Sequence, residues 1–172
     1  PWSGAATFKS QILLMRRAMG LIVLCRDKGS GTITIDRNGE PRLHYPISAH
    51  DRRSMLDGIE TCVRIVAATG ACAVGTGQNG LPDMTDLPPA DESSSEEELR
   101  LRDAAVDELI LKVRCAGIDP KYRQPIFSAH QMGTCRMGTA PASSVVDPHG
   151  QLWGVRGLYV ADTSVFPTSS GA

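Results

Sequence analysis

The chain has 172 residues, of which 41% are hydrophobic and 22% charged, and its 18 basic and 19 acidic residues give a formal net charge of -1. This composition excludes a disordered or fibrous chain and predicts one sizeable core, or one core with part of a second domain. No stretch gathers Lys and Arg with interleaved aromatic residues, so nucleic acid is not expected as a partner.

Cysteine usage, apolar runs and the chain ends limit the class further. The five cysteines are odd in number, scattered and without a C-x-x-C pair, which argues against a disulfide scaffold. The longest apolar stretch, residues 19–25, is far shorter than the roughly 20 residues that span a bilayer, so we expect no membrane span. The chain begins at Pro1 without Met and stops at Ala172 within a Thr-Ser-Ser-Gly-Ala run, and both ends are expected to be cuts through a longer protein.

The first predicted elements are a helix, a strand and a hairpin. Residues 9–18 are compatible with a short helix, and the apolar residues 19–25 with a buried strand. The Thr-Ile-Thr-Ile-Asp pattern after Gly31 has the period of two that is typical of a half-buried strand. A turn at residues 37–40 then joins it to a second strand at 42–47, which completes the hairpin.

A long amphipathic helix is predicted after the hairpin. Ser48 followed by Asp51 resembles a capping box, with a side-chain acceptor at the N-cap and a carboxylate near the positive end of the helix. Apolar residues then recur at helical spacing to about Gly70. The prolines and the serine run between residues 80 and 95 predict an exposed loop.

A second helix is predicted between Ser95 and Gly117. Ser95 with Glu98 repeats the capping pattern, and Gly117 can adopt the left-handed conformation that often follows a helix. Helical spacing places four apolar residues on one side of this helix, and we expect that stripe to be buried: Leu99, Val106, Ile110 and Val113.

The loop between the two helices contains a glycine motif. Residues 75–80 match the G-x-G-x-x-G pattern of dinucleotide-binding loops. In that role the motif must open a helix, because the pyrophosphate binds the amides at the helix's N-terminus. Residues 81–89 contain three prolines and cannot form a helix. We therefore interpret the motif as a plain glycine loop, with phosphate binding as the alternative.

The glycine-rich section from Ser128 onwards carries the candidate chemistry. Residues 158–161 predict a short buried strand that ends at Asp162, and residues 167–170 resemble the entry into a helix. A strand that leads to an acidic residue and then a helix is a common ligand-facing arrangement in α/β sheets.

His130 is the candidate catalytic residue. The stretch from His130 to Gly138 places an imidazole at the edge of a loop whose glycines let a ligand approach the backbone. Histidine as a residue type titrates at about pH 6.5, as a general base requires. From the residues alone, a structural histidine, a Cys135 nucleophile with His130 as its base, and a zinc site of His130, Cys135 and His149 remain alternatives, although none of these ligands is paired at close spacing.

Three blocks of this section together resemble a known family. Residues 128–138, 145–150 and 154–168 closely resemble, in the right order, the C-terminal signature of the glucose-methanol-choline (GMC) oxidoreductases. The upstream Arg-Asp-Lys-Gly-Ser-Gly segment at 26–31, with the hairpin and helix that follow, looks most like plant long-chain fatty alcohol oxidases. A dehydrogenase for a small polar alcohol such as choline is the alternative within the family.

The resemblance implies a reaction and a set of site residues. It implies FAD-dependent oxidation of a long-chain primary alcohol to an aldehyde, with oxygen or another acceptor taking the electrons. His130 would be the catalytic base. Asp162 would accept a hydrogen bond from a sugar-like hydroxyl of FAD, the amides of Thr163 and Ser164 would face the cofactor, and Ala161 would lie beside them. The alternative for Asp162 is that it merely caps the turn that follows.

The resemblance also implies the fold and the missing parts. We expect an α+β chain in which residues 1–127 form an antiparallel substrate-binding sheet with flanking helices. Residues 128–172 would run through the active site and return to an FAD-binding domain elsewhere in the same polypeptide. The family's second active-site residue, an Asn or His, would lie just beyond Ala172, so a catalytically silent fragment is a further alternative. The whole protein would associate with membranes.

Overall fold

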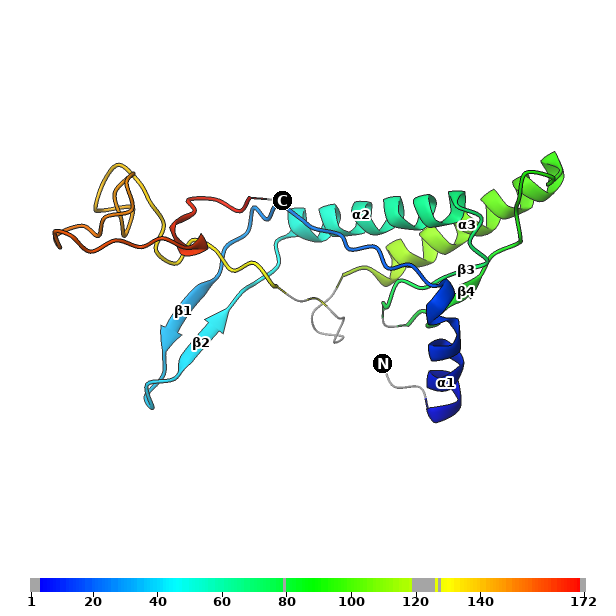
Figure 1. The fold of residues 1–172 in the computed structure, drawn as a ribbon, viewed down its shortest axis with the longest axis horizontal. Coiled ribbons are helices and arrows are strands. Elements are labelled where there is room, and N and C mark those ends of the chain that lie inside the picture. Colours follow the sequence, from blue (N-terminus) through cyan, green and yellow to red (C-terminus); the bar gives the residue numbers. More distant parts are fainter. Residues whose placement is uncertain (1–3, 79, 119–125, 127, 171–172) are drawn as a thin grey trace. The chain divides into compact units, whose positions relative to one another are not determined.

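The structure is a computed structural model that describes residues 4–78, 80–118, 126 and 128–170. The described residues form three α-helices and two antiparallel sheets of two strands each (Figure 1). The expected α+β class is confirmed, but the sheets are smaller than the substrate-binding sheet that the resemblance implies. Pro1, Phe127 and Ala172, on which the expected ends and the expected boundary at 127 fall, lie outside the described residues.

The chain divides into two compact units that are discontinuous in sequence. One unit comprises residues 1–23 and 52–125, and the other comprises residues 24–51 and 126–172. The second unit contains all three blocks of the C-terminal signature together with the hairpin.

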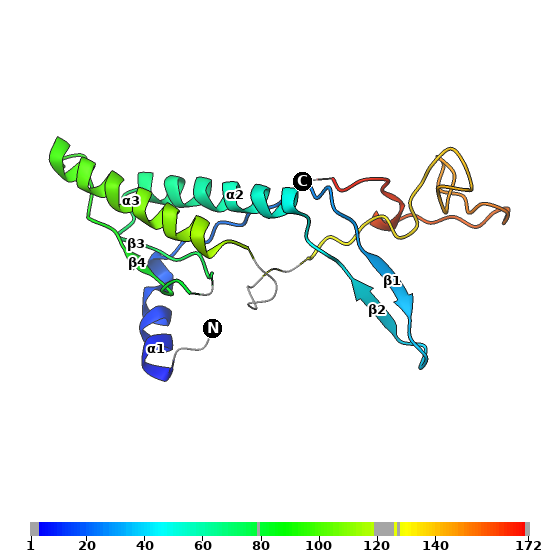
Figure 2. The ribbon, with the colours of Figure 1, turned by 180° about the vertical axis from the view of Figure 1, so that it is seen from behind.

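Two antiparallel helices form the first unit's core. Helices α2 (Ala49–Ala68) and α3 (Glu96–Ala116) lie side by side in both views (Figure 1, Figure 2). Arg114 near the end of α3 forms ion pairs with Asp57 and Glu60 in the middle of α2. Buried apolar side chains from both helices and from the loop between them make up the core: Val63, Ala67, Val74, Leu87, Val106, Leu109, Ile110 and Val113.

Helix α3 begins as its sequence predicts. The Ser95 hydroxyl accepts from the Glu98 amide, and the Glu98 carboxylate accepts from the Ser95 amide, which completes the capping box. The predicted burial of Leu99 is wrong: it is 43% exposed, because the first turn of α3 extends past the end of α2 (Figure 1). Gly117 has the positive φ expected of it, at +66°, but its ψ of -168° is extended rather than left-handed helical.

A buried arginine closes the end of helix α2. The Arg102 side chain, 4% exposed, donates to the carbonyls of Ala67 at 2.6 Å, Ala71 at 2.9 Å and Pro88. The last turn of a helix leaves carbonyls without partners, and a cation near that end is also favoured by the helix dipole. The Arg102 side chain therefore satisfies carbonyl groups that the fold removes from water.

The glycine motif also serves a helix end. Strand β3 (Ala73–Val74) leads into it and pairs with β4 (Thr85–Asp86), so the described residues of the loop join two strands and open no helix. The buried Gln78 amide donates to the carbonyls of Val113 at 3.1 Å and Gly117 at 2.8 Å, at the end of α3. Asn79 lies outside the described residues.

The N-terminal elements differ in part from expectation. Helix α1 (Ala5–Leu14) and the 3-10 turn η1 (Met15–Arg17) cover the predicted helix and start earlier. The strand predicted at residues 19–25 is wrong: the segment is irregular, and within the described chain no strand lies beside it to complete a ladder. Only alternate residues are half-buried, such as Val23, which contacts α2 at Gly58. No helix in the described ranges is long and apolar enough to cross a bilayer.

The second unit contains the predicted hairpin. Strands β1 (Thr32–Ile35) and β2 (Pro41–His44) pair antiparallel, with Ile33 opposite Leu43. The Asp36 carboxylate fixes the turn by accepting from the amides of Asn38 at 2.9 Å and Glu40 at 3.0 Å. The first strand was expected to be half-buried, but all eight residues of the two strands are exposed.

Arg102 gives a test of what stabilises the first unit. Arg102→Ala removes a buried side chain together with its hydrogen bonds to three carbonyls. Although the Ala67 carbonyl keeps the Gly70 amide as a donor at 3.0 Å, we expect the variant to lower the free energy of unfolding by about 2–4 kcal/mol. Arg100→Ala changes an exposed arginine two residues away in the same helix and should alter stability by no more than about 0.5 kcal/mol. Urea denaturation of both variants measures the difference, and equal midpoints would contradict the structural role of Arg102.

Candidate active site

His130 opens a loop that has no regular secondary structure. We call residues 130–138 the His130 loop; the imidazole at its start is exposed. Gly133 within it has φ +80°, and a Cβ at this position would lie 3.2 Å from the carbonyl oxygen of Phe166. Glycine is therefore required there both for the backbone angle and for the close approach of residue 166.

The His130 loop is held by a short turn from the third signature block. This 3-10 turn, η3 (Thr163–Val165), follows directly after Asp162. Three alternate amides of the loop, from Gly133, Cys135 and Met137, donate in turn to the carbonyls of Thr163 at 3.3 Å, Ser164 at 2.9 Å and Val165 at 2.8 Å. The Thr163 carbonyl also accepts from the Phe166 amide at 3.2 Å, which closes the turn, and the loop supplies donors for the carbonyls of Ser164 and Val165 at its end.

The side chains before and within η3 strengthen this junction. The Asp162 carboxylate caps the turn by accepting from the Ser164 amide at 2.8 Å. The Thr163 hydroxyl donates to the carbonyl of Gln131 at 2.9 Å, next to His130 in sequence. Hydrogen bonds from the hydroxyl and then the amide of Ser164 lower the pKa of Asp162 below the ordinary aspartate value. Asp162 is therefore a carboxylate at neutral pH. It makes the contact expected if it caps the turn that follows, which was the alternative to a cofactor role.

The second signature block forms a tight turn around Asp147. Its carboxylate accepts from the amides of His149 at 2.8 Å and Gln151 at 2.9 Å. Gly150 has φ +83°, and a Cβ there would lie 3.0 Å from the carbonyl oxygen of Val160. The Val160 amide in turn donates to the Gly150 carbonyl at 2.9 Å, so that the third block lies against the second.

The end of the His130 loop joins this turn. The Gly138 amide donates to the carbonyl of Val146, whose side chain is fully buried. The Trp153 indole N–H donates to the Ser144 hydroxyl at 2.8 Å, and a Cβ at Gly138 would come within 2.8 Å of the Ser144 Cβ. Backbone hydrogen bonds thus bring the three blocks, separate in sequence, into one cluster.

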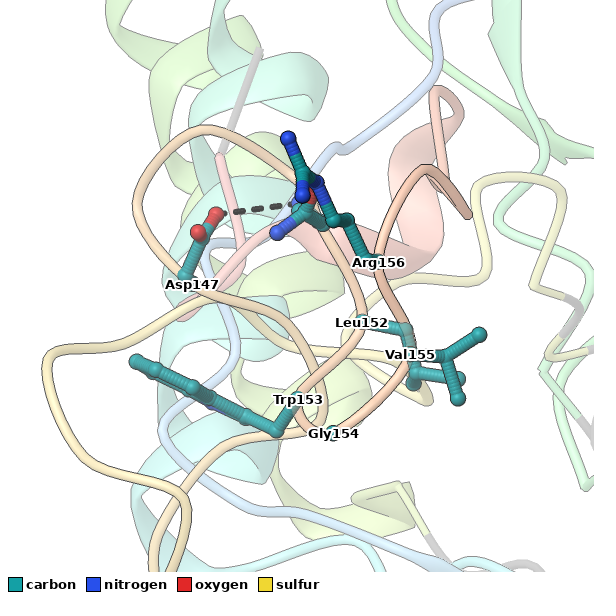
Figure 3. A pocket seen from close by; sticks show the side chains of 7 residues that line it. Asp147, Leu152, Trp153, Gly154, Val155 and Arg156 are labelled. Carbon is teal, nitrogen blue, oxygen red and sulfur yellow. Dashed lines mark hydrogen bonds between the residues drawn. The ribbon is translucent and has the colours of Figure 1, made fainter.

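A pocket of about 440 Å³ lies beside the Asp147 turn. Figure 3 shows Asp147 on one side, joined by a hydrogen bond to the backbone of the lining, and the flat ring of Trp153 on another. The lining residues come from the second and third blocks and from the three residues that join them: Asp147, Gln151, Leu152, Trp153, Gly154, Val155 and Arg156. His130 does not line this pocket, which is therefore distinct from the position predicted for the base.

A strand predicted in the third block is absent from the described structure. Residues 158–161 form no strand beyond an isolated bridge between Tyr159 and Gln151, because no neighbouring strand in the described chain pairs with them. Residues 167–170 are not helical. Ala161, Asp162 and Thr163 are all exposed, as residues that meet a ligand must be.

Cys135 and His149, the residues of the alternative nucleophile and zinc sites, make hydrogen bonds here through their backbone amides. Cys135 is half-buried, and its amide takes part in the junction with η3. His149 is exposed, and its amide is fixed by Asp147. Within the described ranges, no three His, Cys, Asp or Glu side chains gather closely enough to hold a metal ion.

Sequence reasoning missed how the 26–29 segment contributes to the same unit. The Arg26 side chain donates to the Ser169 carbonyl at 3.1 Å, and the Ser169 hydroxyl donates to the Asp27 carbonyl at 2.6 Å. The amides of Lys28 and Gly29 each donate at 2.9 Å to the buried carboxylate of Asp51. The capping pattern at Ser48 predicted a carboxylate at Asp51 but gave no sign of these partners.

Comparison with known proteins identifies the family. A family model described as GMC oxidoreductase matches residues 27–172. The chain belongs to the GMC oxidoreductase family. The resemblance that the three signature blocks predicted is thereby confirmed, and the cluster described above is the family's C-terminal signature in three dimensions.

Curated relatives share sequence with nearly the whole chain. It is 36% identical to the long-chain-alcohol oxidase FAO4A and 31% identical to the long-chain-alcohol oxidase FAO4B, both of Arabidopsis thaliana, over 99% of this chain and 21% of each relative. It is 33% identical to an uncharacterized GMC-type oxidoreductase of Mycobacterium tuberculosis, over 76% of this chain and 20% of that protein. This GMC domain thus spans about a fifth of the length of the curated relatives it matches. No solved structure matches it.

The cap at Asp162 predicts a loss of local structure in acid. Because the pKa of Asp162 is lowered in the folded chain, the cap is fully present above the ordinary aspartate pKa of about 3.9 and is lost as the pH falls through the lowered value. We expect the Ser164 amide to lose protection from hydrogen exchange only in that acid range.

Asp162→Asn provides the matched control. An asparagine side chain accepts the same hydrogen bond without titrating, so Ser164 protection should become independent of pH over this range. Hydrogen exchange followed by NMR at a series of pH values measures both proteins. The same acid dependence in both would show that Asp162 is not the group responsible.

Proposed function

We propose that this domain supplies the catalytic base, His130, in the FAD-dependent oxidation of a long-chain primary alcohol to an aldehyde. The observation that carries the proposal is the attachment of the His130 loop to η3: an exposed imidazole begins a loop whose amides are fixed by the carbonyls of residues 163–165. Membership of the GMC family and the relatives named long-chain-alcohol oxidases support it.

The residues before and within η3 suit a flavin cofactor with a polyol chain. Asp162 is an exposed carboxylate held by the Ser164 amide, and its low pKa keeps it an acceptor for a hydroxyl group. A carboxylate favours a hydroxyl donor over a phosphate, so Asp162 would hold the ribityl hydroxyls rather than the pyrophosphate. Ala161 and Thr163 would contribute backbone groups beside it. FAD, when bound, supplies the acceptor for the hydride that leaves the alcohol carbon.

The chemical role of His130 follows from its side chain. An imidazole nitrogen takes the proton of the alcohol hydroxyl while the adjacent carbon loses its hydride, which leaves the carbonyl group of the aldehyde. The exposed position lets a substrate reach the ring, and the fixed loop limits the directions in which the ring points. The electrons then pass to oxygen or another acceptor.

His130→Ala tests the assignment of the base. In the FAD-containing polypeptide that carries this domain, we expect the variant to keep its bound FAD but to slow flavin reduction by alcohol about 10²- to 10⁴-fold, since proton transfer to a positioned side chain contributes about that much. Anaerobic stopped-flow absorbance of the flavin measures the rate. The control His149→Ala removes an exposed imidazole whose backbone amide makes the contact with Asp147, and it should reduce flavin at the wild-type rate. An unchanged rate for His130→Ala would remove His130 from this role.

The substrate class has a separate test. Each further buried CH₂ group contributes about 0.8 kcal/mol, so kcat/KM should rise steadily from 1-butanol to 1-dodecanol if a long chain is bound. Choline, a small cationic alcohol, should react more slowly than 1-dodecanol. A kcat/KM that is independent of chain length, or highest for choline, would contradict the proposed substrate while leaving the role of His130 intact.

A further inference from the structure

Thr163 contacts the His130 loop through both its side chain and its main chain. Its hydroxyl donates to the Gln131 carbonyl at 2.9 Å, and its carbonyl accepts from the Gly133 amide at 3.3 Å. The two contacts span three consecutive residues of the loop, 131–133. This is the only side-chain hydrogen bond that the structure gives between η3 and the described residues of the loop.

The contact lies one residue from the proposed base. The carbonyl of Gln131 belongs to the peptide group between residues 131 and 132, one residue after His130. Holding this group in place limits rotation of the backbone next to His130. The His130 ring is exposed and is not held by a packed core. Its direction therefore depends on the backbone that carries it, and small displacements of a catalytic group reduce rates strongly.

The Thr163 hydroxyl has one proton, and the Gln131 carbonyl receives it. While this bond persists, the hydroxyl cannot donate to a cofactor. A cofactor contact by Thr163 would then use its backbone groups or the lone pairs of the hydroxyl.

We propose that Thr163 is a positioning residue for His130: its hydroxyl holds the loop in the conformation from which the imidazole reaches the alcohol. This rests on the proposed function for the identity of the base. The contact itself is a property of this chain and has its own readout, the opening of the loop.

Thr163→Val removes only the donor. Valine has nearly the same shape and the same branching at Cβ, and it keeps the carbonyl that accepts from Gly133. In the FAD-loaded enzyme we expect kcat for the alcohol to fall about five- to tenfold with little change in KM, in keeping with the loss of one hydrogen bond. The pH profile of kcat/KM should keep its shape, because the base itself is unchanged.

Hydrogen exchange reports on the loop without relying on activity. In Thr163→Val the Gly133 amide should exchange about five- to tenfold faster, whereas the Met137 amide, bonded to Val165 at the far end of the junction, should be unaffected. Thr163→Ser restores the donor and should recover most of both losses. Thr61→Val removes a matched hydroxyl-to-carbonyl bond inside α2, to Asp57 at 2.8 Å, and should alter neither kcat nor Gly133 exchange.

The outcomes separate this proposal from the others. A Thr163→Val enzyme with normal Gly133 exchange but weakened FAD binding would overturn it in favour of a cofactor contact. Wild-type kcat together with faster Gly133 exchange would overturn it as well, since the contact would then be structural only. If His130 is not the base, a different experiment shows it: the rate of flavin reduction would be unchanged in His130→Ala.

Discussion

The candidate site depends on one set of backbone hydrogen bonds between the His130 loop and the 3-10 turn η3. A single 3-10 turn has carbonyl groups with no partners inside the turn, and an irregular glycine loop has amides with none inside the loop. Each segment would be costly to order alone. Paired through residues 133–137 and 163–165, they satisfy each other, and this pairing sets where His130 stands relative to Asp162.

The same constraint shapes the helical unit, with side chains in place of a loop. Arg102 satisfies carbonyls at the end of α2, and Gln78 satisfies those at the end of α3. In both units, carbonyl groups at the end of a helix or 3-10 turn accept hydrogen bonds from residues that are distant in sequence. The apolar core supplies the burial, and these contacts make that burial compatible with the polar backbone.

How much the sequence predicts depends on how far apart the interacting residues are. The capping box at Ser95 and the hairpin turn at residues 37–40 are predicted correctly, because their partners lie within four residues. The burial of Arg102 and the junction between Gly133 and Thr163 join residues about 30 positions apart, and no local pattern reveals them. The strands expected at 19–25 and 158–161 are wrong because an apolar run cannot by itself supply a pairing partner. Family membership was predicted from three sequence blocks and is confirmed by the family model, while the roles of His130 and Asp162 stay predictions.

The alternate spacing of the donors at 133, 135 and 137 has a consequence for how this domain can diverge. The loop contributes only main-chain groups to the junction, so side chains at 135 and 137 can vary among many residue types while the loop keeps its path. Proline alone would delete a donor at either position, and at 133 the left-handed backbone excludes nearly every residue but glycine. The loop thus tolerates changes of side chain at 135 and 137 but not changes in backbone freedom.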